Sequence, residues 1–310
     1  MNFLRKLNWR VVFVLAMAFA ALNNPAVLAS PEPSGQEKEY LKTVYSKMAA
    51  VDSAHFDILM QAVTPMGQID FTIAGEGKAE PMAYKSDIKI SYRDLQNKEN
   101  TMVVKQYIEQ DKDQMTCYSF FNEKWIKQVV PYVDPLGQKP SAAAKAKMTQ
   151  AMLELIKDVK GQEETSAYKD LAITLDGAKL GSFVQSVLQQ GNHQNKELLA
   201  MQQEPMIQAA LQNLGDMKYT LRVDKNTDLV TETKMDLTEP IRKSANAFLA
   251  VSAMKPEAKA GLKDFLAKST LQVQVKYSQV NAVDKVEIPQ AVREQAQEVK
   301  IAEQPESVKA

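Results

Sequence analysis

The most regular alternation of apolar and polar positions in this chain runs from Met217 to Leu237. Every second residue of its first half is apolar: Met217, Tyr219, Leu221 and Val223. Residues 224–228 are turn formers, and Leu229, Met235 and Leu237 resume the apolar face on the way back. A period of two indicates a strand with one buried and one solvated face. The pattern therefore predicts an antiparallel hairpin that needs a cover on one side only.

The first half of the chain repeats this alternation. Apolar residues alternate over 56–62, 69–73 and 82–92, and further strands are predicted over 101–109, 115–121 and 125–132. Pro65-Met66-Gly67 and Gly75-Glu76-Gly77 are predicted turns. The strand 82–92 would be about 35 Å long at about 3.3 Å per residue. Strands of that length favour a wide, curved sheet over a compact sandwich.

Helical spacing, with apolar residues three and four positions apart, appears at the start of the chain and again in its second half. Helices are predicted over 36–51, 141–159, 180–190, 197–214 with a break at Pro205, 240–254 and 256–268. Short strands are predicted over 168–175 and 271–277. Because the helices cluster between strands that must still pair, the predicted class is α+β. We expect a curved antiparallel sheet, an open half-barrel, with helices packed on its concave face.

The N-terminus has the composition of an export signal. Arg5, Lys6 and Arg10 precede an apolar run over 11–22, and Val27-Leu28-Ala29 suits cleavage after Ala29. An uncleaved anchor is the alternative. The predicted organisation is a signal peptide at 1–29, a linker at 30–36, an α+β domain at 37–292 with a helical insertion at 239–268, and a polar tail at 293–310.

Charge and cysteine content narrow the function classes. The signal carries three of the 38 basic residues and no acidic one, which leaves 35 basic against 38 acidic side chains. A near-neutral chain argues against nucleic acid as a partner. Cys117 is the only cysteine, so no intramolecular disulfide forms and the signal region offers no thiol for a lipid anchor. We expect Cys117 to be buried, and the mature protein to be periplasmic or secreted, not lipidated and not integral to a membrane.

Catalytic and metal-binding patterns are scarce. The two histidines, His55 and His193, have no cysteine or carboxylate at ligand spacing. No G-x-S-x-G, S-x-x-K or H-E-x-x-H motif occurs. Asp224–Asp228 begins like a calcium loop, but Leu229 and Met235 occupy the positions of the required glycine and glutamate. A turn explains these residues as well, and paired carboxylates from distant positions remain open as a glycosidase alternative. We predict no cofactor, no metal and no enzymatic activity.

Several segments resemble the LolA/LppX-type extracytoplasmic carriers. They are the opening helix 37–51 followed by Ser53–Met60, the run Tyr118–Lys127 with Trp125-x-Lys127, the segment Val223-Asp224-Lys225-x-Thr227 leading into Met235-Asp236-Leu237, and the closing Val286-Glu287-Ile288-Pro289. The chain is similar to uncharacterised exported members of that superfamily over most of 36–292. The resemblance implies an unclosed barrel with helices on its concave side, and a cavity between them that accepts acyl chains. The relatives' lipidated cysteine is absent here, and 239–268 is extra helical material.

The apolar faces of the predicted strands are the candidate lining of such a cavity. The candidate ligand-binding residues are Phe56, Ile58, Met60, Phe71, Met82, Tyr84, Ile88, Ile90, Met115, Met217, Tyr219, Leu221 and Met235. Methionine adapts to variable ligands, although it also fills ordinary cores. The first hypothesis is therefore an exported carrier or sensor for a lipid or other hydrophobic small molecule. The alternative is an envelope interaction protein with a filled core, which meets its partner through the helices around 247–267 or the tail at 291–310.

Overall fold

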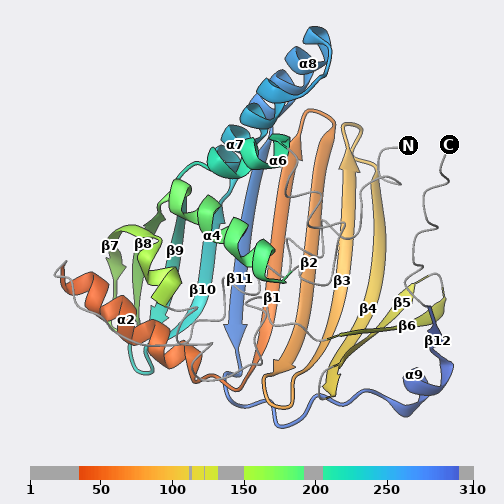
Figure 1. Cartoon of the computed structure of the whole chain (residues 1–310). Coiled ribbons are helices and arrows are strands. Elements are labelled where there is room, and N and C mark those ends of the chain that lie inside the picture. The colour runs from red at the N-terminus through yellow and green to blue at the C-terminus, as the bar shows by residue number, and fades with distance from the viewer. Residues whose placement is uncertain (1–34, 112–113, 122, 132–149, 192–204, 300–310) are drawn as a thin grey trace. The chain divides into compact units, whose positions relative to one another are not determined.

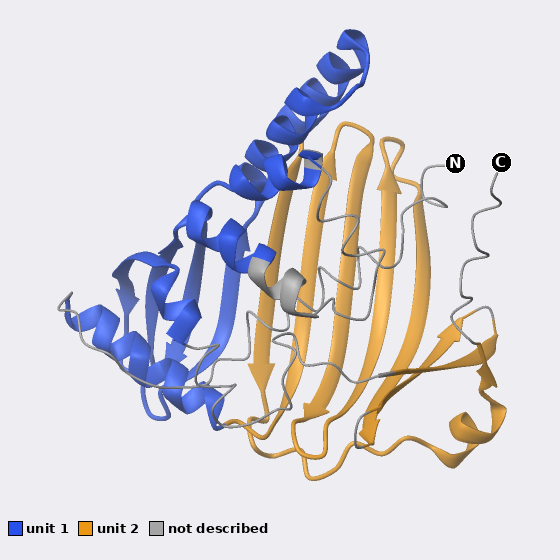
Figure 2. Ribbon diagram, in the orientation of Figure 1, with its two compact units in different colours: residues 1–50, 133–267 blue, residues 51–132, 268–310 orange. Residues whose placement is uncertain are grey.

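The computed structural model describes residues 35–111, 114–121, 123–131, 150–191 and 205–299. The chain divides into two compact units, which Figure 2 distinguishes by colour. Unit 1 takes its residues from 1–50 and 133–267, and unit 2 from 51–132 and 268–310. The predicted signal peptide, most of the predicted linker and His193 lie outside the described residues.

Unit 2 is built on an antiparallel meander. Its strands are β1 (Ser53–Thr64), β2 (Gly67–Lys78), β3 (Ala83–Asp94), β4 (Glu99–Asp111), β5 (Gln114–Phe121), β6 (Lys124–Pro131), β11 (Thr270–Ser278) and β12 (Gln297–Glu298). Within the unit they lie in the order β12-β6-β5-β4-β3-β2-β1-β11 (Figure 1). β1 to β4 contain 12 or 13 residues each, which confirms the long strands expected from the alternation.

The predicted turn at Gly75-Glu76-Gly77 is wrong, because these residues lie inside β2. Gly75 is opposite Phe56 in β1, and Gly77 is opposite Tyr84 in β3. A Cβ atom at Gly75 would lie 2.8 Å from the Phe56 ring, and one at Gly77 would lie 2.5 Å from the Tyr84 ring. The glycines therefore make room for the aromatic rings of neighbouring strands, which is one reason why glycine occurs inside a strand.

The C-terminal part of unit 2 covers one corner of its sheet. α9 (Gln290–Gln295) follows Ile288, and Ile288 and Val292 pack on Tyr118 of β5. Trp125 of β6 joins this aromatic cluster, with ring centroids 5.2 Å from Phe120 and 5.7 Å from Tyr107. Arg293 pairs with Glu109 in β4, and β12 then joins β6 in parallel.

Unit 1 combines four antiparallel strands with helices. The strands are β7 (Ile156–Glu164), β8 (Tyr168–Leu175), β9 (Met217–Asp224) and β10 (Leu229–Asp236), in the order β10-β9-β8-β7. α2 (Gln36–Ala49) contacts β10 and β7. The side chains of Leu41, Val44, Leu171, Ile173, Leu175 and Val223 are at most 1% exposed. The predicted hairpin is confirmed, and one of its faces is the core of this unit.

The remaining helices of unit 1 are α4 (Gly177–Gly191), α6 (Pro205–Gln212), α7 (Thr238–Val251) and α8 (Pro256–Ala267). α6 packs on both α4 and α7. A Cβ atom at Gly181 would lie 2.0 Å from the carbonyl oxygen of Leu211, so glycine is needed where α4 approaches the end of α6. Helices are confirmed in the segments predicted over 180–190, 240–254 and 256–268, and in the part of the predicted helix 197–214 that begins at Pro205, while residues 197–204 lie outside the described residues.

The predicted helix over 141–159 is wrong in its last part. Residues 150–154 are helical, but Ile156–Glu164 form β7, and Gly161 lies inside this strand. β7 pairs antiparallel with β8 after the turn at Thr165, whose side-chain oxygen accepts hydrogen bonds from the backbone N–H groups of Ala167 and Tyr168. Pairing with a neighbouring strand has overridden the apolar spacing of three and four residues that favoured a helix.

The α+β class and the open antiparallel sheet with helices are thus confirmed. Among the described residues, no helix is both long and apolar enough to cross a membrane.

Candidate ligand-binding face

One face of the unit 2 sheet consists of uncharged rows of side chains. Directly paired residues of antiparallel strands point to the same face, so the strand register assigns each residue to a row. Two central rows are wholly apolar: Val275, Ile58, Ile73, Ile88 and Val104, and beside it Val273, Met60, Phe71, Ile90 and Met102. We use the name apolar face for the whole set of neighbouring rows that begins with Leu271–Ala62–Ile69–Tyr92 and ends with Gly77–Tyr84–Ile108–Cys117, both of these rows included.

Burial on the apolar face is uneven. Val273, Val275, Ile88 and Val104 are at most 7% exposed. Met60, Phe71, Ile90, Met102 and their neighbours Phe56, Ile58, Ile69, Ile73 and Ile108 are only partly buried. α9, the helix among the described residues of unit 2, packs instead on the opposite face, where Tyr118 lies. The apolar face therefore offers partly exposed apolar side chains next to buried ones.

Charge is concentrated on the other face of this sheet, although Asp94 and Lys124, which lie beyond the rows defined above, share the side of the apolar face. None of the paired positions in the rows of the apolar face is Asp, Glu, Lys or Arg. The opposite face carries cross-strand ion pairs instead, among them Lys85 with Glu76 at 3.6 Å and Arg93 with Glu99 at 3.4 Å. His55 lies on that face too, with its Nε2 3.6 Å from Oδ2 of Asp57. The sheet is amphipathic across its thickness.

Polar but uncharged groups gather at one end of the apolar face. Gln106 pairs with Ser86 and with Ser119, and Cys117 lies in the next row. Nε2 of Gln106 donates to Sγ of Cys117 at 3.1 Å and to Oγ of Ser119 at 3.4 Å. Burial raises the pKa of the Cys117 thiol above its ordinary value, and it does the same to the phenol of Tyr84. These groups stay neutral at physiological pH.

The structure separates the predicted site residues into two groups. Nine belong to unit 2: Phe56, Ile58, Met60, Phe71, Tyr84, Ile88 and Ile90 lie in rows of the apolar face, and Met82 and Met115 lie at its end beside Gln110. Met217, Tyr219, Leu221 and Met235 belong to unit 1, where each is at most 9% exposed. Sequence reasoning missed Val273, Val275, Met102, Val104 and Ile108. Their period-two alternation was the available signal.

The unit 1 residues form a tightly packed interior. Leu221 is paired with Leu171 and Thr233, and Tyr219 with Ile173 and Met235. The hydroxyl of Tyr219 lies 2.6 Å from that of Tyr45 in α2. Burial raises the pKa of Tyr45 to about 12 and also raises the pKa of Tyr219 well above its ordinary value. These side chains hold α2 against β9 and β10.

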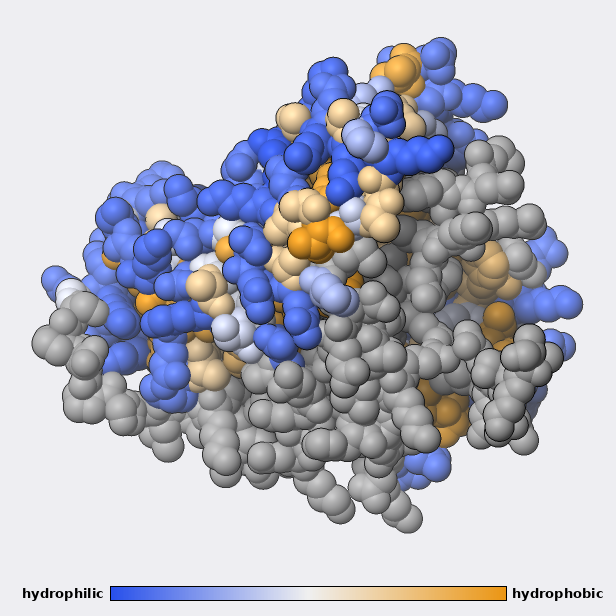
Figure 3. Space-filling view, turned by 45° about the horizontal axis from the view of Figure 1, so that its top comes forward, coloured by the Kyte–Doolittle hydropathy of each residue, from blue (hydrophilic) through white to orange (hydrophobic). Residues whose placement is uncertain are grey.

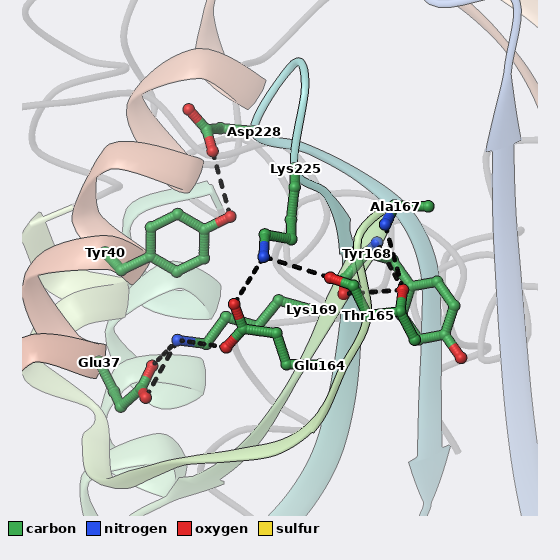
Figure 4. A network of polar contacts seen from close by, with 9 residues as sticks. All are labelled: Glu37, Tyr40, Glu164, Thr165, Ala167, Tyr168, Lys169, Lys225 and Asp228. Atoms are coloured by element: carbon green, nitrogen blue, oxygen red, sulfur yellow. Dashed lines mark hydrogen bonds and ion pairs between the residues drawn. The ribbon is translucent and has the colours of Figure 1, made fainter.

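A polar network at the start of α2 also holds this helix against the strands of unit 1 (Figure 4). Lys169 in β8 lies 2.8 Å from Oε2 of Glu37, and Lys225 lies 2.7 Å from Oε1 of Glu164. The Tyr40 hydroxyl donates to Asp228 at 3.1 Å. Burial, and to a smaller extent this hydrogen bond to a carboxylate, raises the pKa of Tyr40 to about 12. Each charge has an opposite charge beside it, so the network fastens α2 to the β7–β8 and β9–β10 hairpins.

The calcium-like segment 224–228 is a turn. Oδ1 of Asp224 accepts hydrogen bonds from the backbone N–H groups of Asn226 and Thr227, and Asp228 pairs with Lys47 at 2.7 Å. Its carboxylates are thus occupied by the protein itself. Within the described residues, no three His, Cys, Asp or Glu side chains converge as metal ligands would.

Unit 1 has an open pocket of about 410 Å³ on its surface. Its lining comes from residues 151–155 and from the first two turns of α4: Ala151, Glu154, Leu155, Ala178, Lys179, Ser182 and Phe183. The Lys179 ammonium donates to the carbonyl of Glu154 at 3.2 Å. None of the predicted site residues lines this pocket, and its lining, unlike the rows of the apolar face, includes charged residues, Glu154 and Lys179.

The described fold defines an α+β protein that is built on an open antiparallel sheet. The model of a family of unknown function, DUF6612, matches residues 36–297, and the chain belongs to this family.

Two solved structures are similar at low levels. The crystal structure of the Mycobacterium tuberculosis lipoprotein LppX covers 81% of this chain and 97% of its own, with 9% identity and a TM-score of 0.37. A DUF1329 family protein from Desulfovibrio piger covers 83% of this chain and 96% of its own, with 7% identity and a TM-score of 0.27. None of the curated proteins compared with the chain matches it.

Proposed function

We propose that this protein is an exported carrier or sensor that holds a lipid or other hydrophobic molecule against the apolar face of unit 2, without catalysing a reaction. The observation that carries the proposal is the uncharged, partly exposed character of that face across β11 and β1 to β4. Burying apolar surface is the dominant source of affinity for such a ligand, at about 25 cal/mol per Å² removed from water. The signal-like N-terminus supports export.

The two ends of the face indicate what kind of molecule fits. An acyl chain matches the wholly apolar rows around Phe71 and Ile90, whose side chains carry no hydrogen-bonding group. At the other end, Gln106, Ser119 and Cys117 present amide, hydroxyl and thiol groups. An anionic head group would find no cationic partner in these rows, and burying an unpaired charge is costly. A ligand with a neutral polar end, such as an ester, amide or alcohol, is therefore favoured over a free fatty acid.

The test is direct. The mature protein is purified from its native source without detergent and extracted with organic solvent, and the extract is analysed by mass spectrometry. The delipidated protein is then titrated with a fluorescent acyl ester and with the corresponding free acid, while its melting temperature is followed. We expect co-purified lipid, saturable ester binding that raises the melting temperature, and weaker binding of the acid. An empty extract together with no thermal shift would exclude the proposal.

A further inference from the structure

The α7–α8 hairpin leaves apolar side chains uncovered. None of the twelve residues of α8 is buried. Leu262 in α8 is 40% exposed, and Val251 and Met254, at the end of α7 and in the connection to α8, are 53% and 37% exposed. Hydrophilic side chains surround the few apolar ones over the described helices of unit 1 (Figure 3). Two of these three exposed apolar side chains thus lie where the two helices meet and the third lies in α8, while Ile241 in the first turn of α7 is also 40% exposed.

The residues of α8 are sorted by charge around the helix axis. At about 100° per residue, Ala258, Leu262, Phe265 and Leu266 fall within an arc of about 100°. Lys259 and Lys263 flank this arc on one side, and Glu257 and Asp264 lie on the far side. Lysines beside an apolar stripe, with acidic residues turned away, are typical of helices that lie in a membrane interface.

The hairpin is also a local concentration of positive charge. Residues 255–268 contain four lysines and two acidic residues, a balance of +2 in a chain whose formal net charge is zero. Arg242 of α7 donates to the carbonyl groups of Leu266 and Ala267, and Lys259 donates to that of Ala250 at 3.4 Å. These bonds join the two helices, so the lysines and the apolar arc are presented by one ordered element.

We propose that the α7–α8 hairpin binds the surface of an anionic phospholipid bilayer. Val251, Met254 and Leu262 would enter the region between head groups and acyl chains. The aliphatic stems of Lys259 and Lys263 would cover the adjacent apolar surface, with their ammonium groups at the phosphates. Charge complementarity favours an anionic membrane over a protein partner, because the lysines flank the apolar arc while the acidic side chains face away from it. This surface is distinct from the apolar face of unit 2.

The experiment is co-sedimentation of the full mature chain with vesicles. One set contains phosphatidylglycerol and phosphatidylcholine in equal parts, and the other contains phosphatidylcholine alone. We expect binding to the anionic vesicles that weakens as salt is added, and much weaker binding to the neutral ones. Replacing two lysines near the surface, as Lys259→Gln with Lys263→Gln, should weaken binding on the order of 30-fold. The separate variant Leu262→Ser leaves the net charge unchanged, and it should also weaken binding to anionic vesicles.

The matched control removes the same charge elsewhere. The double variant Lys160→Gln with Lys285→Gln changes two side chains that are both 74% exposed, and it should bind anionic vesicles like the wild type. Circular dichroism checks that each variant is folded. The proposal is overturned if the wild type does not bind anionic vesicles, if the control loses as much affinity as the α8 variant, or if Leu262→Ser leaves vesicle binding intact and instead abolishes a defined protein complex. Acyl-ester binding by Lys259→Gln with Lys263→Gln is measured in parallel. Its retention separates a failure of membrane docking from a failure of the proposed ligand site.

Discussion

Met102 and Val103 are adjacent in β4 and allow a matched test of the apolar face. Met102 lies in a row of that face, opposite Ile90, whereas Val103 lies on the charged face and is 53% exposed. Replacing each in turn by aspartate adds the same charge at neighbouring positions on opposite sides of one sheet. We expect Met102→Asp to abolish most acyl-ester binding and Val103→Asp to leave it unchanged.

The size of the effect follows from burial and protonation. Losing the contact of a methionine side chain with the ligand costs about 1.5–3 kcal/mol. A carboxylate under the ligand either remains charged without a partner or takes up a proton. Protonating an aspartate of ordinary pKa at neutral pH costs about 4 kcal/mol. A loss of at least about 2 kcal/mol, a factor of about 30 in affinity, is therefore expected for Met102→Asp.

Titration of the fluorescent acyl ester at two pH values measures this. Because ligand binding favours the neutral carboxyl, affinity of Met102→Asp should partly recover as pH falls toward the ordinary pKa of aspartate, and Val103→Asp should show no such response. Melting curves establish that both variants fold. Equal losses in the two variants, or no loss in Met102→Asp, would refute the assignment of the ligand to this face.

Three further predictions concern stability and are read from urea unfolding. Gly77→Ala should lower the free energy of unfolding by about 1–3 kcal/mol, because its Cβ would press on the Tyr84 ring. Gly261→Ala in α8, where no atom lies within 4 Å of the new Cβ, should instead raise it by about 0.5–1 kcal/mol. Equal effects would contradict the packing argument. Tyr45→Phe should cost about 1–3 kcal/mol by leaving the buried Tyr219 hydroxyl without its partner, and a double variant with Tyr219→Phe should recover part of this loss. The pKa values of Tyr40 and Tyr45 are both raised to about 12, so between pH 10 and 12 the folded state retains protons that the unfolded chain releases. Stability should therefore fall as pH rises from 10 toward 12, and it should fall less steeply in Tyr45→Phe. An unchanged slope in that variant would contradict the assignment.

The β9–β10 hairpin shows how far alternation alone predicts the fold. Met217, Tyr219, Leu221 and Val223 are buried as predicted. In β10, however, a register shift between Val230 and Glu232 buries Val230 in place of Leu229, on the same face as Thr233 and Met235. The backbone N–H of Val230 there donates to Sδ of Met48 in α2, at 3.2 Å. A bulge without glycine leaves no mark in the sequence, since it depends on the helix that packs above it.

Predicting the site depended on pairing between distant segments. Alternation correctly places Ile58, Phe71 and Ile90 on one face of their own strands, but it carries no information about which strands pair. Met217 and Tyr219 show the same alternation as Ile58, although they pack into the interior of unit 1. Apolar lining and apolar core look alike in sequence, because both satisfy the same period.

The distinction between lining and core decides where a ligand can bind. The unit 1 candidates, such as Leu221 and Met235, pack against side chains of their own unit, so a ligand there would have to displace packed residues, at a cost of about 2–5 kcal/mol for each large side chain removed. On the apolar face of unit 2, Phe71 and Ile90 are already partly exposed, and a ligand gains their burial without displacing a core. If a ligand binds as proposed, the same argument accounts for the absence of charged side chains from the rows of the apolar face. A carboxylate or ammonium in these rows would lose its hydration when the ligand binds, with no partner of opposite charge to compensate.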